Sequence, residues 1–482
     1  MHARAQPPKF PRPVQWEPLA VLPILAGLYW LLGGEGWWLL WALLPGSLLL
    51  TTGIALLLMP GEPRLSQYMA LGGFVGAVLA LPAMFADGLL GGLCALLFSA
   101  VGFVVAGRVA LMQAPLVEGV PRPDLTVAVC AKAALDEALL AYFVGSANMP
   151  DAEDIERQLQ HLAEFERLAA SEGWAQRPEQ LHPEPPAPES AHAAAATIYG
   201  HNYEQVHYES AFAPRGDLPG AQDWLAQRDN SGSIAWVKRH TAGGRPWLLC
   251  IHGYRMGLPW LDFSLFPIGW LHHQLGLNLM LPVLPLHGPR RVGLRSGDAY
   301  LEGDPTPLFH AQTQALWDLR RAVKWIRTQD SQARIGVLGY SLGGYNTALL
   351  SQYESGLDFV VAGIPAVDFS ELIWRHVPPL HRRYYESQGV TQARIQQLLK
   401  PLSPLARKPL VAENARYIFA GSADRVVTPD QIPQLARHWN VPVQWYAGGH
   451  LSFRGEQSVR THIEAAMTRA GWDIETATLA AT

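Results

Sequence analysis

The stretch "RIGVLGYSLGGYN" (334–346) joins an apolar run to a glycine-rich turn. The apolar residues 335–340 predict a strand buried on both faces, and the apolar residues after the turn predict a helix. On the turn, Ser341 has Gly339 and Gly343 two positions away on either side. A nucleophile there has strained backbone angles, and side chains at the two flanking positions would collide. We therefore predict a nucleophilic Ser341; an ordinary loop serine is the alternative, because a chain with 44 glycines also produces this pattern by chance.

A serine nucleophile needs a base, and the base needs an orienting acid. "GSADRVVTPD" (421–430) places Asp424 after a predicted strand, and "YAGGH" (446–450) places His450 after the last one. Loops that follow parallel strands meet at one edge of the sheet, so these residues can converge with Ser341. A turn-capping aspartate and a structural histidine are the competing interpretations, and Asp368 in "GIPAVDFS" is the rival acid.

An oxyanion intermediate needs preorganised N–H donors. The loop "CIHGYRMG" (250–257) follows the strand two before that of the nucleophile, so we expect one donor to be the backbone N–H of Tyr254. The second is the N–H of Leu342, directly after the nucleophile. We interpret His252 as a structural hydrogen-bonding residue more than a second base. The substrate-pocket candidates are His252, Gly253, His287, Tyr340 and Trp374.

From about residue 195, strand patterns alternate with helical ones. "PWLLCIHG", "LNLMLPVLPL" and "DFVVAGIP" are continuous apolar runs, as expected of strands covered on both faces. This order predicts an α/β domain with a mostly parallel sheet and helices on both faces.

Residues from about 195 to 470 resemble the α/β-hydrolase-fold serine hydrolases. The resemblance rests on the order and spacing of His252-Gly253, 339–343, 421–424 and Gly449-His450. It implies a catalytic domain over 195–482, with Ser341 as nucleophile, His450 as base and Asp424 as its orienting acid. It also implies a cap at 369–410. We expect no metal or organic cofactor, because the proposed chemistry needs none and no metal-ligand spacing such as HExxH occurs. "HGYR" lacks the extra glycines of the HGGG lipases and esterases, so the chain departs from that subgroup.

Four stretches at the N-terminus carry no charged residue: 18–34, 36–59, 65–86 and 88–107. A membrane-spanning helix needs about 20 apolar residues, so the last three are long enough and the first is marginal. We therefore predict an all-α membrane domain over 1–113 with about four transmembrane helices. A cleaved signal peptide followed by buried helices is the alternative. Because the spans contain no ionisable group, anchoring is favoured over transport.

The charges around these stretches predict an orientation. Basic residues precede span one, lie between spans two and three, and follow span four, whereas the other two loops carry acids. The positive-inside rule then places both termini in the cytoplasm, in a cytoplasmic (inner) membrane. If 18–34 does not span, the N-terminus moves outside and the catalytic domain stays inside. The residues involved are Arg4, Lys9, Arg12, Glu35, Arg64, Asp87 and Arg108, with Trp30, Trp37, Trp38 and Trp41 near one rim.

A helical connector is predicted over 114–177. Its first part, 125–145, is apolar but interrupted by three charged residues, which indicates a helix on a protein or membrane surface more than a fifth span. Its second part has acids near Pro150, Gly173 at its end and one apolar face between them, which could dimerise or, as we expect, dock on the catalytic domain. A Pro-rich linker follows at 178–194.

The overall composition and net charge exclude few further classes of function. The net charge of −4 with no basic block gives no nucleic-acid footprint, and three scattered cysteines predict no disulfide framework. The sequence therefore predicts a membrane-anchored serine hydrolase of a carboxylic ester, with a lipophilic acyl ester or a thioester as variants. A peptidase or amidase using the same triad is the enzymatic alternative. A non-catalytic membrane adaptor that retains the fold is the alternative of another class.

Overall fold

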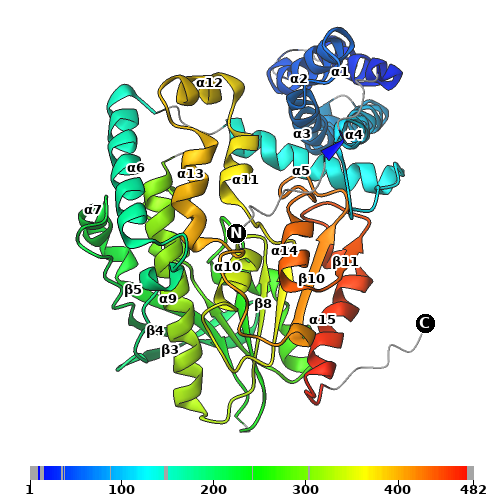
Figure 1. The fold of residues 1–482 in the computed structure, drawn as a ribbon. Coiled ribbons are helices and arrows are strands. Elements are labelled where there is room, and N and C mark those ends of the chain that lie inside the picture. Colours follow the sequence, from blue (N-terminus) through cyan, green and yellow to red (C-terminus); the bar gives the residue numbers. More distant parts are fainter. Residues whose placement is uncertain are drawn as a thin grey trace. The chain divides into compact units, whose positions relative to one another are not determined.

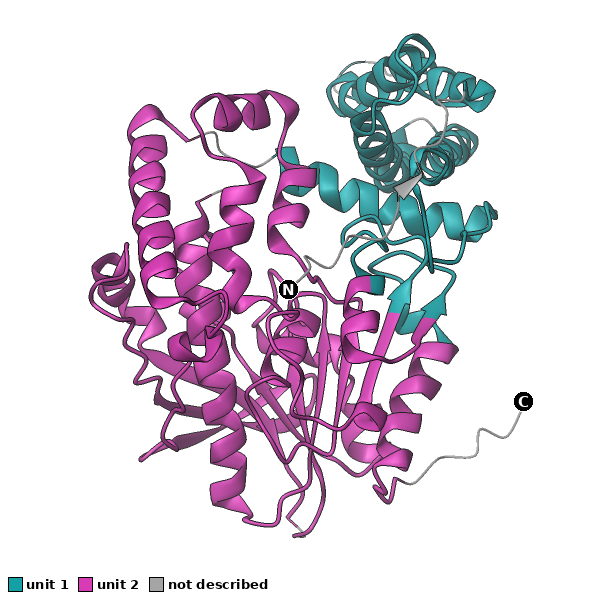
Figure 2. Cartoon of the chain, in the orientation of Figure 1, with its two compact units in different colours: residues 1–147, 420–433, 445–457 teal, residues 148–419, 434–444, 458–482 magenta. Residues whose placement is uncertain are grey.

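The computed structural model describes residues 9–10, 16–33, 36, 38–86, 88–145, 150–241, 243–301 and 304–474 (Figure 1). The charges of Arg4, Lys9, Arg12, Glu35 and Asp87, and Trp37, lie outside the described residues or side chains, so the orientation stays a prediction. The chain divides into two compact units, coloured separately in Figure 2. Unit 1 comprises 1–147, 420–433 and 445–457, and unit 2 comprises 148–419, 434–444 and 458–482.

Unit 1 begins with apolar helices. Three of them, α2, α3 and α4, are long and apolar enough to cross a membrane, whereas the first apolar helical segment, Pro18–Gly33, is shorter. A short antiparallel pair, β1 (Lys9–Phe10) with β2 (Leu116–Val117), accompanies them. The helices are η1 (Pro18–Ala20), α1 (Val21–Gly33), α2 (Trp38–Leu58), α3 (Arg64–Ala86) and α4 (Gly88–Gln113).

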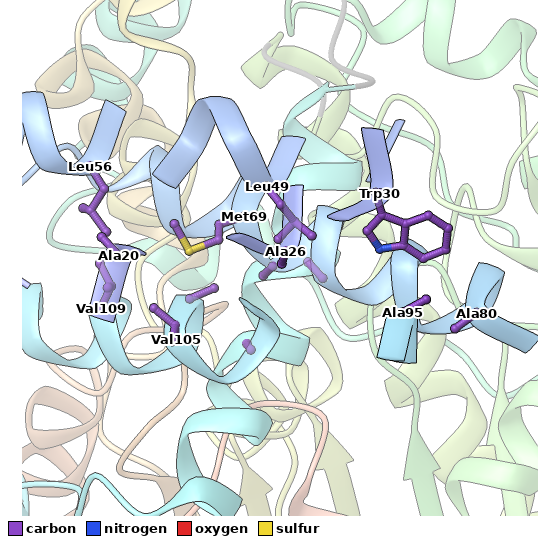
Figure 3. Close-up of a cluster of buried hydrophobic side chains, with 14 of the residues drawn as sticks. Ala20, Ala26, Trp30, Leu49, Leu56, Met69, Ala80, Ala95, Val105 and Val109 are labelled. Carbon is purple, nitrogen blue, oxygen red and sulfur yellow. The ribbon is translucent and has the colours of Figure 1, made fainter. Parts of the chain in front are cut away.

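Small residues let these helices pack closely. A Cβ added to Gly92 would lie 2.3 Å from Cγ of Met84, and one added to Gly73 would lie 2.8 Å from the backbone nitrogen of Phe103. Figure 3 shows the buried side chains between the helices, with Trp30 beside Ala80 and Ala95. Large apolar side chains such as Phe85 and Leu90 point outward and are exposed. Small residues inside and large apolar ones outside are typical of helices packed in lipid.

The next helix of unit 1, α5 (Val127–Gly145), packs against α3 and α4. Its first half also forms a small apolar cluster with a residue from a distant part of the chain, Ala423. For 125–145 the sequence predicted a helix on a protein or membrane surface more than a fifth span, and in the described part of the chain α5 is not one of the candidate spans. Its acids Asp136 and Glu137 are both buried.

Unit 2 begins with α6 (Ala152–Glu172), where the sequence predicted it. The Asp151 carboxylate accepts a hydrogen bond from the N–H of Asp154, and Gly173 ends the helix with a left-handed backbone. The apolar face docks on α9 (Pro305–Gln329), where the rings of Phe165 and Phe309 lie 4.6 Å apart between centroids. The expectation that this helix docks on the α/β domain that follows it is therefore confirmed.

The nine-stranded sheet has the order β11-β10-β9-β8-β6-β7-β5-β4-β3. β7, β6, β8, β9 and β10 pair in parallel in that sequence, and β3, β4, β5 and β7 pair antiparallel. The four strands β6 to β9 consist of buried residues only, as their continuous apolar sequences predicted. The strands are β3 (His192–Ile198), β4 (His201–Glu209), β5 (Gly232–Lys238), β6 (Trp247–Ile251), β7 (Asn278–Pro282), β8 (Ile335–Tyr340), β9 (Phe359–Gly363), β10 (Arg416–Gly421) and β11 (Val443–Tyr446).

The segment 178–194 contains the start of a strand that its sequence did not predict. This segment was expected to be an extended linker, but it contains a short helix, η2 (Pro178–Leu181), and the first residues of β3. Alanine favours strands weakly, so "HAAAATI" gives no local strand signal. Its full-length pairing with β4 therefore determines the strand.

Further helices flank the strands of the sheet, and three of them, α11, α12 and α13, occupy the segment where a cap was predicted. Whether these three cover a substrate stays a prediction. The helices are α7 (Ala221–Ala226), α8 (Pro259–Leu265), α10 (Leu342–Leu350), α11 (Phe369–His376), α12 (Pro379–Ser387), α13 (Gln392–Leu399), α14 (Ile432–Trp439) and α15 (Gln457–Arg469), with short turns η3 (Arg228–Asn230), η4 (Gly269–Gln274), η5 (Gly288–Arg290), η6 (Lys400–Leu402), η7 (Glu413–Ala415) and η8 (Phe453–Gly455).

Candidate active site

Ser341 lies on a sharp turn between a buried strand and a helix. It follows β8 directly and precedes α10, and its backbone angles are φ 58° and ψ −115°. A positive φ is unfavourable for a residue with a side chain, so the surrounding structure must impose it. The N–H of Ser341 donates to the carbonyl of Gly363 at 2.9 Å, and its carbonyl accepts from the N–H of Tyr345 at 3.0 Å. These bonds hold the turn to the next strand and to its own helix.

At the two glycines around this serine there is no room for a side chain. A Cβ added to Gly339 would lie 2.1 Å from the carbonyl oxygen of Gly343. A Cβ added to Gly343 would lie 1.9 Å from the carbonyl oxygen of Ile251, at the end of β6. Both distances are far below contact distance, and the clashing atoms belong to the backbone. The steric reason given for the G-x-S-x-G pattern therefore holds in this structure.

The proposed oxyanion donors come from two elements of unit 2. Leu342 is the first residue of α10, whose N-terminal N–H groups point out of the helix with a partial positive charge. Tyr254 lies in the loop after β6. That loop approaches the serine, because a Cβ added to Gly253 would lie 3.7 Å from the Cβ of Ser341. The loop and the helix start therefore both lie beside the turn of Ser341.

His252 holds this loop through both ring nitrogens. Its Nε2 accepts from the N–H of Leu284 at 3.0 Å, so its Nδ1 carries the proton and donates to the carbonyl of Gly253 at 2.8 Å. Burial lowers the pKa of His252, although Asp262 opposes this shift. A neutral histidine with both nitrogens engaged positions the loop and is not suited to act as a base.

In unit 1, Asp424 and His450 form a hydrogen-bonded pair. The Nδ1 of His450 lies 2.7 Å from Oδ2 of Asp424. The other carboxylate oxygen, Oδ1, accepts from the N–H groups of Val426 and Val427, both at 2.9 Å. The backbone therefore fixes the acid, and the acid fixes the imidazole with its proton on Nδ1. This leaves Nε2 as the basic nitrogen.

The electrostatics of this pair favour a protonated imidazole. Burial of His450 lowers its pKa, but the neighbouring Asp424 and Asp136 carboxylates outweigh burial, and the net shift is upward. A base with a raised pKa accepts a proton more readily, and an adjacent carboxylate stabilises the imidazolium that results.

The remaining predicted residues have visible structural roles. Asp368 caps α11 by accepting from the N–H groups of Ser370 and Glu371, and its other oxygen accepts from Gln396. The ring of Tyr340 stacks on Phe266 inside the core. His287 is fully buried, with its Nδ1 2.8 Å from the carbonyl oxygen of Pro285, and Trp374 on α11 donates to Glu386.

Ser341 belongs to unit 2, whereas Asp424 and His450 belong to unit 1. Each of the three follows the carboxyl end of a strand of the same sheet, namely β8, β10 and β11. The structure thus shows the strained serine turn and the acid–histidine pair separately. Their action as one triad stays a prediction and is proposed below.

Sequence reasoning missed a third carboxylate beside the acid–histidine pair. Asp136 on α5 accepts a hydrogen bond from the backbone N–H of His450 at 2.6 Å. The available signal was the adjacent acids Asp136 and Glu137 inside an otherwise apolar helix. That pattern indicates buried, partnered acids, but the spacing alone does not reveal the partner.

The strand order, the parallel strand arrangement and the strained serine turn define an α/β-hydrolase fold. A family model described as the prolyl oligopeptidase family matches residues 309–444. Two acetyl xylan esterase structures are similar: one from Paenibacillus sp. R4 (16% identity, 62% of this chain and 92% of that chain, TM-score 0.42) and one from Thermoanaerobacterium sp. JW/SL YS485 (14%, 67% and 96%, TM-score 0.41).

The chain belongs to a family that includes uncharacterised proteins of Mycobacterium tuberculosis. It is 35% identical to the protein of strain CDC 1551 over 348 residues, which cover 72% of this chain and 83% of the relative. The protein of strain H37Rv is 34% identical over 348 residues, which again cover 72% of this chain and 83% of the relative.

Proposed function

We propose that this chain is a serine hydrolase that cleaves a carboxylic ester, with Ser341, His450 and Asp424 as its catalytic triad. One observation carries the proposal: a strained serine turn and a hydrogen-bonded acid–histidine pair follow strands of one sheet. The chain order Ser, Asp, His is the order used on α/β-hydrolase sheets. The α/β-hydrolase fold supports the reaction class and leaves the substrate open.

In the proposed mechanism, Nε2 of His450 takes the proton of the Ser341 hydroxyl as its oxygen attacks the ester carbonyl. The N–H groups of Leu342 and Tyr254 donate to the oxyanion that forms. His450 then protonates the leaving alcohol, which departs and leaves an acyl-enzyme. In the second half, His450 activates water, and collapse of the new tetrahedral intermediate releases the acid and restores Ser341.

A panel of substrates tests ester against amide cleavage. We expect p-nitrophenyl esters to be hydrolysed faster than p-nitroanilides with the same acyl group, and long acyl chains to be preferred over acetyl. The reason for the chain-length preference is the apolar anchor, which concentrates the enzyme where lipophilic esters partition. The family match to prolyl oligopeptidases favours the peptidase alternative. Faster release from aminoacyl anilides than from esters would establish that alternative.

We further propose that α2, α3 and α4 anchor the chain in a cytoplasmic membrane, with the catalytic domain in the cytoplasm. Their length, their outward apolar side chains and their close packing through small residues support anchoring. The full chain is expected to stay in the membrane pellet at alkaline pH. In sealed inverted vesicles, external protease is expected to digest the catalytic domain. A protease-protected domain would contradict this orientation, and extraction at alkaline pH would contradict anchoring.

A further inference from the structure

Asp136 accepts hydrogen bonds from three backbone N–H groups in the two loops that carry the acid–histidine pair. Its Oδ2 accepts from the N–H of His450 at 2.6 Å and from that of Arg425 at 3.1 Å. Its Oδ1 accepts from the N–H of Leu451 at 3.2 Å. Asp424 lies on one of these loops and His450 on the other. One carboxylate on α5 therefore fastens the acid's loop to the base's loop.

The fit between α5 and the base loop leaves no room for a side chain. A Cβ added to Gly449 would lie 2.6 Å from Oδ2 of Asp136 and 2.8 Å from the carbonyl oxygen of Lys132. On the acid's loop, Ala423 packs into a cluster with Cys130. The glycine before the histidine in "YAGGH" is therefore explained by the approach of α5.

The same helix is attached to the apolar helices of unit 1. Glu137, next to Asp136, accepts from Nε of Arg425 at 2.7 Å and from the hydroxyl of Ser66 on α3 at 3.1 Å. On its other side, Ala134 and Ala138 belong to the hydrophobic cluster formed by α1 to α4. α5 thus connects the loops of Asp424 and His450 with the candidate membrane helices.

We propose that Asp136 is a positioning residue of the hydrolase: it fixes the backbone of His450 and, as an anion, stabilises the imidazolium that forms during catalysis. The proposal rests on the proposed function. It makes α5 part of the active-site support, so the order of the acid–histidine pair depends on a helix packed on the membrane anchor. Fixing a catalytic group through surrounding hydrogen bonds is a general requirement of efficient sites.

A purely structural role does not require a carboxylate at this place. Burial first and then the neighbouring Asp424 carboxylate raise the pKa of Asp136 to about 7, although His450 and the backbone donors oppose the shift. Among the described residues, the other groups that face it are Tyr446, whose pKa burial raises, and the pairs Glu137–Arg425 and Lys132–Glu456. Placing one buried carboxylate beside another costs free energy, because their negative charges repel each other. The ionised form of Asp136 gains most when His450 is protonated, which is the state formed in the transition state.

Two substitutions in the full chain test this role. Asp136→Asn removes the negative charge but keeps one oxygen that can accept a hydrogen bond. Asp136→Ala removes the charge and both acceptor oxygens. The pH profile of kcat/KM is expected to move its acid limb to lower pH in both variants, because the pKa of His450 falls. We expect kcat to fall with little change in KM, by on the order of 100-fold in Asp136→Ala, since a displacement of about 1 Å can cost that much.

Asp318→Asn is the matched control. It neutralises another buried carboxylate, one that pairs with Arg290 at 2.8 Å within unit 2. This variant is expected to lower Tm and leave the pH profile in place. If Asp136→Asn also lowers Tm without moving the profile, or leaves kcat at the wild-type value, the positioning role is wrong.

A direct titration of His450 separates this proposal from the proposed function. The histidine is followed by NMR in labelled full chain, with His450→Asn to assign its signal. A lower pKa of His450 in Asp136→Asn supports the electrostatic part of the role independently of ester turnover, and an unchanged pKa overturns the role. Failure of the wild type to react with a fluorophosphonate would overturn the proposed function alone.

Discussion

Ser341→Ala is expected to abolish hydrolysis, with a loss of kcat on the order of 10⁶-fold, because the acyl-enzyme cannot form without the hydroxyl. The strained turn is built to expose this one oxygen beside the start of α10. Alanine fits the turn as well as serine does, so the variant is expected to retain the wild-type Tm. The measurement is labelling by a fluorophosphonate probe together with ester turnover in the full chain.

Ser331→Ala is the control for this loss, because Ser331 is an exposed serine in a turn before β8. It is expected to label and turn over at the wild-type rate. Equal labelling of wild type and Ser341→Ala would reject the serine mechanism. An unlabelled wild type with intact fold would instead favour the non-catalytic adaptor.

Asp424→Asn is expected to lower kcat on the order of 10⁴-fold, because an amide can present its NH₂ group to the imidazole and stabilise the wrong tautomer. The pH dependence should change too. Burial lowers the pKa of His450, but Asp424 and Asp136 raise it overall, so the wild-type base becomes neutral and active only above this raised pKa. Removing the Asp424 charge lowers that pKa, and the acid limb of kcat/KM moves to lower pH.

Asp368→Asn separates the two candidate acids. Asp368 caps α11, and asparagine caps helices as well as aspartate does. We therefore expect this variant to keep the activity and pH profile of the wild type. A large loss in Asp368→Asn, with activity retained in Asp424→Asn, would assign the acid role to Asp368.

The sheet and the strained turn could be predicted because their signals are local. A strand covered on both faces must be apolar throughout, and β6, β8 and β9 are. The helix α6 was equally clear, because capping residues and an apolar face of helical period mark it within one stretch. β3 was missed for the opposite reason, since its alanines carry no strand preference and its pairing with β4 decides its conformation.

By itself, the sequence determined the G-x-S-x-G turn at Ser341 and the order in which Asp424 and His450 follow, because both depend on residue type and spacing along the chain. Only the tertiary structure decided which acid the histidine contacts and which group supports it. Asp424 reaches His450 at 2.7 Å, whereas Asp368 is used as a helix cap. Asp136 is far from both loops in the sequence, and only the packing of α5 brings its carboxylate to their backbone N–H groups.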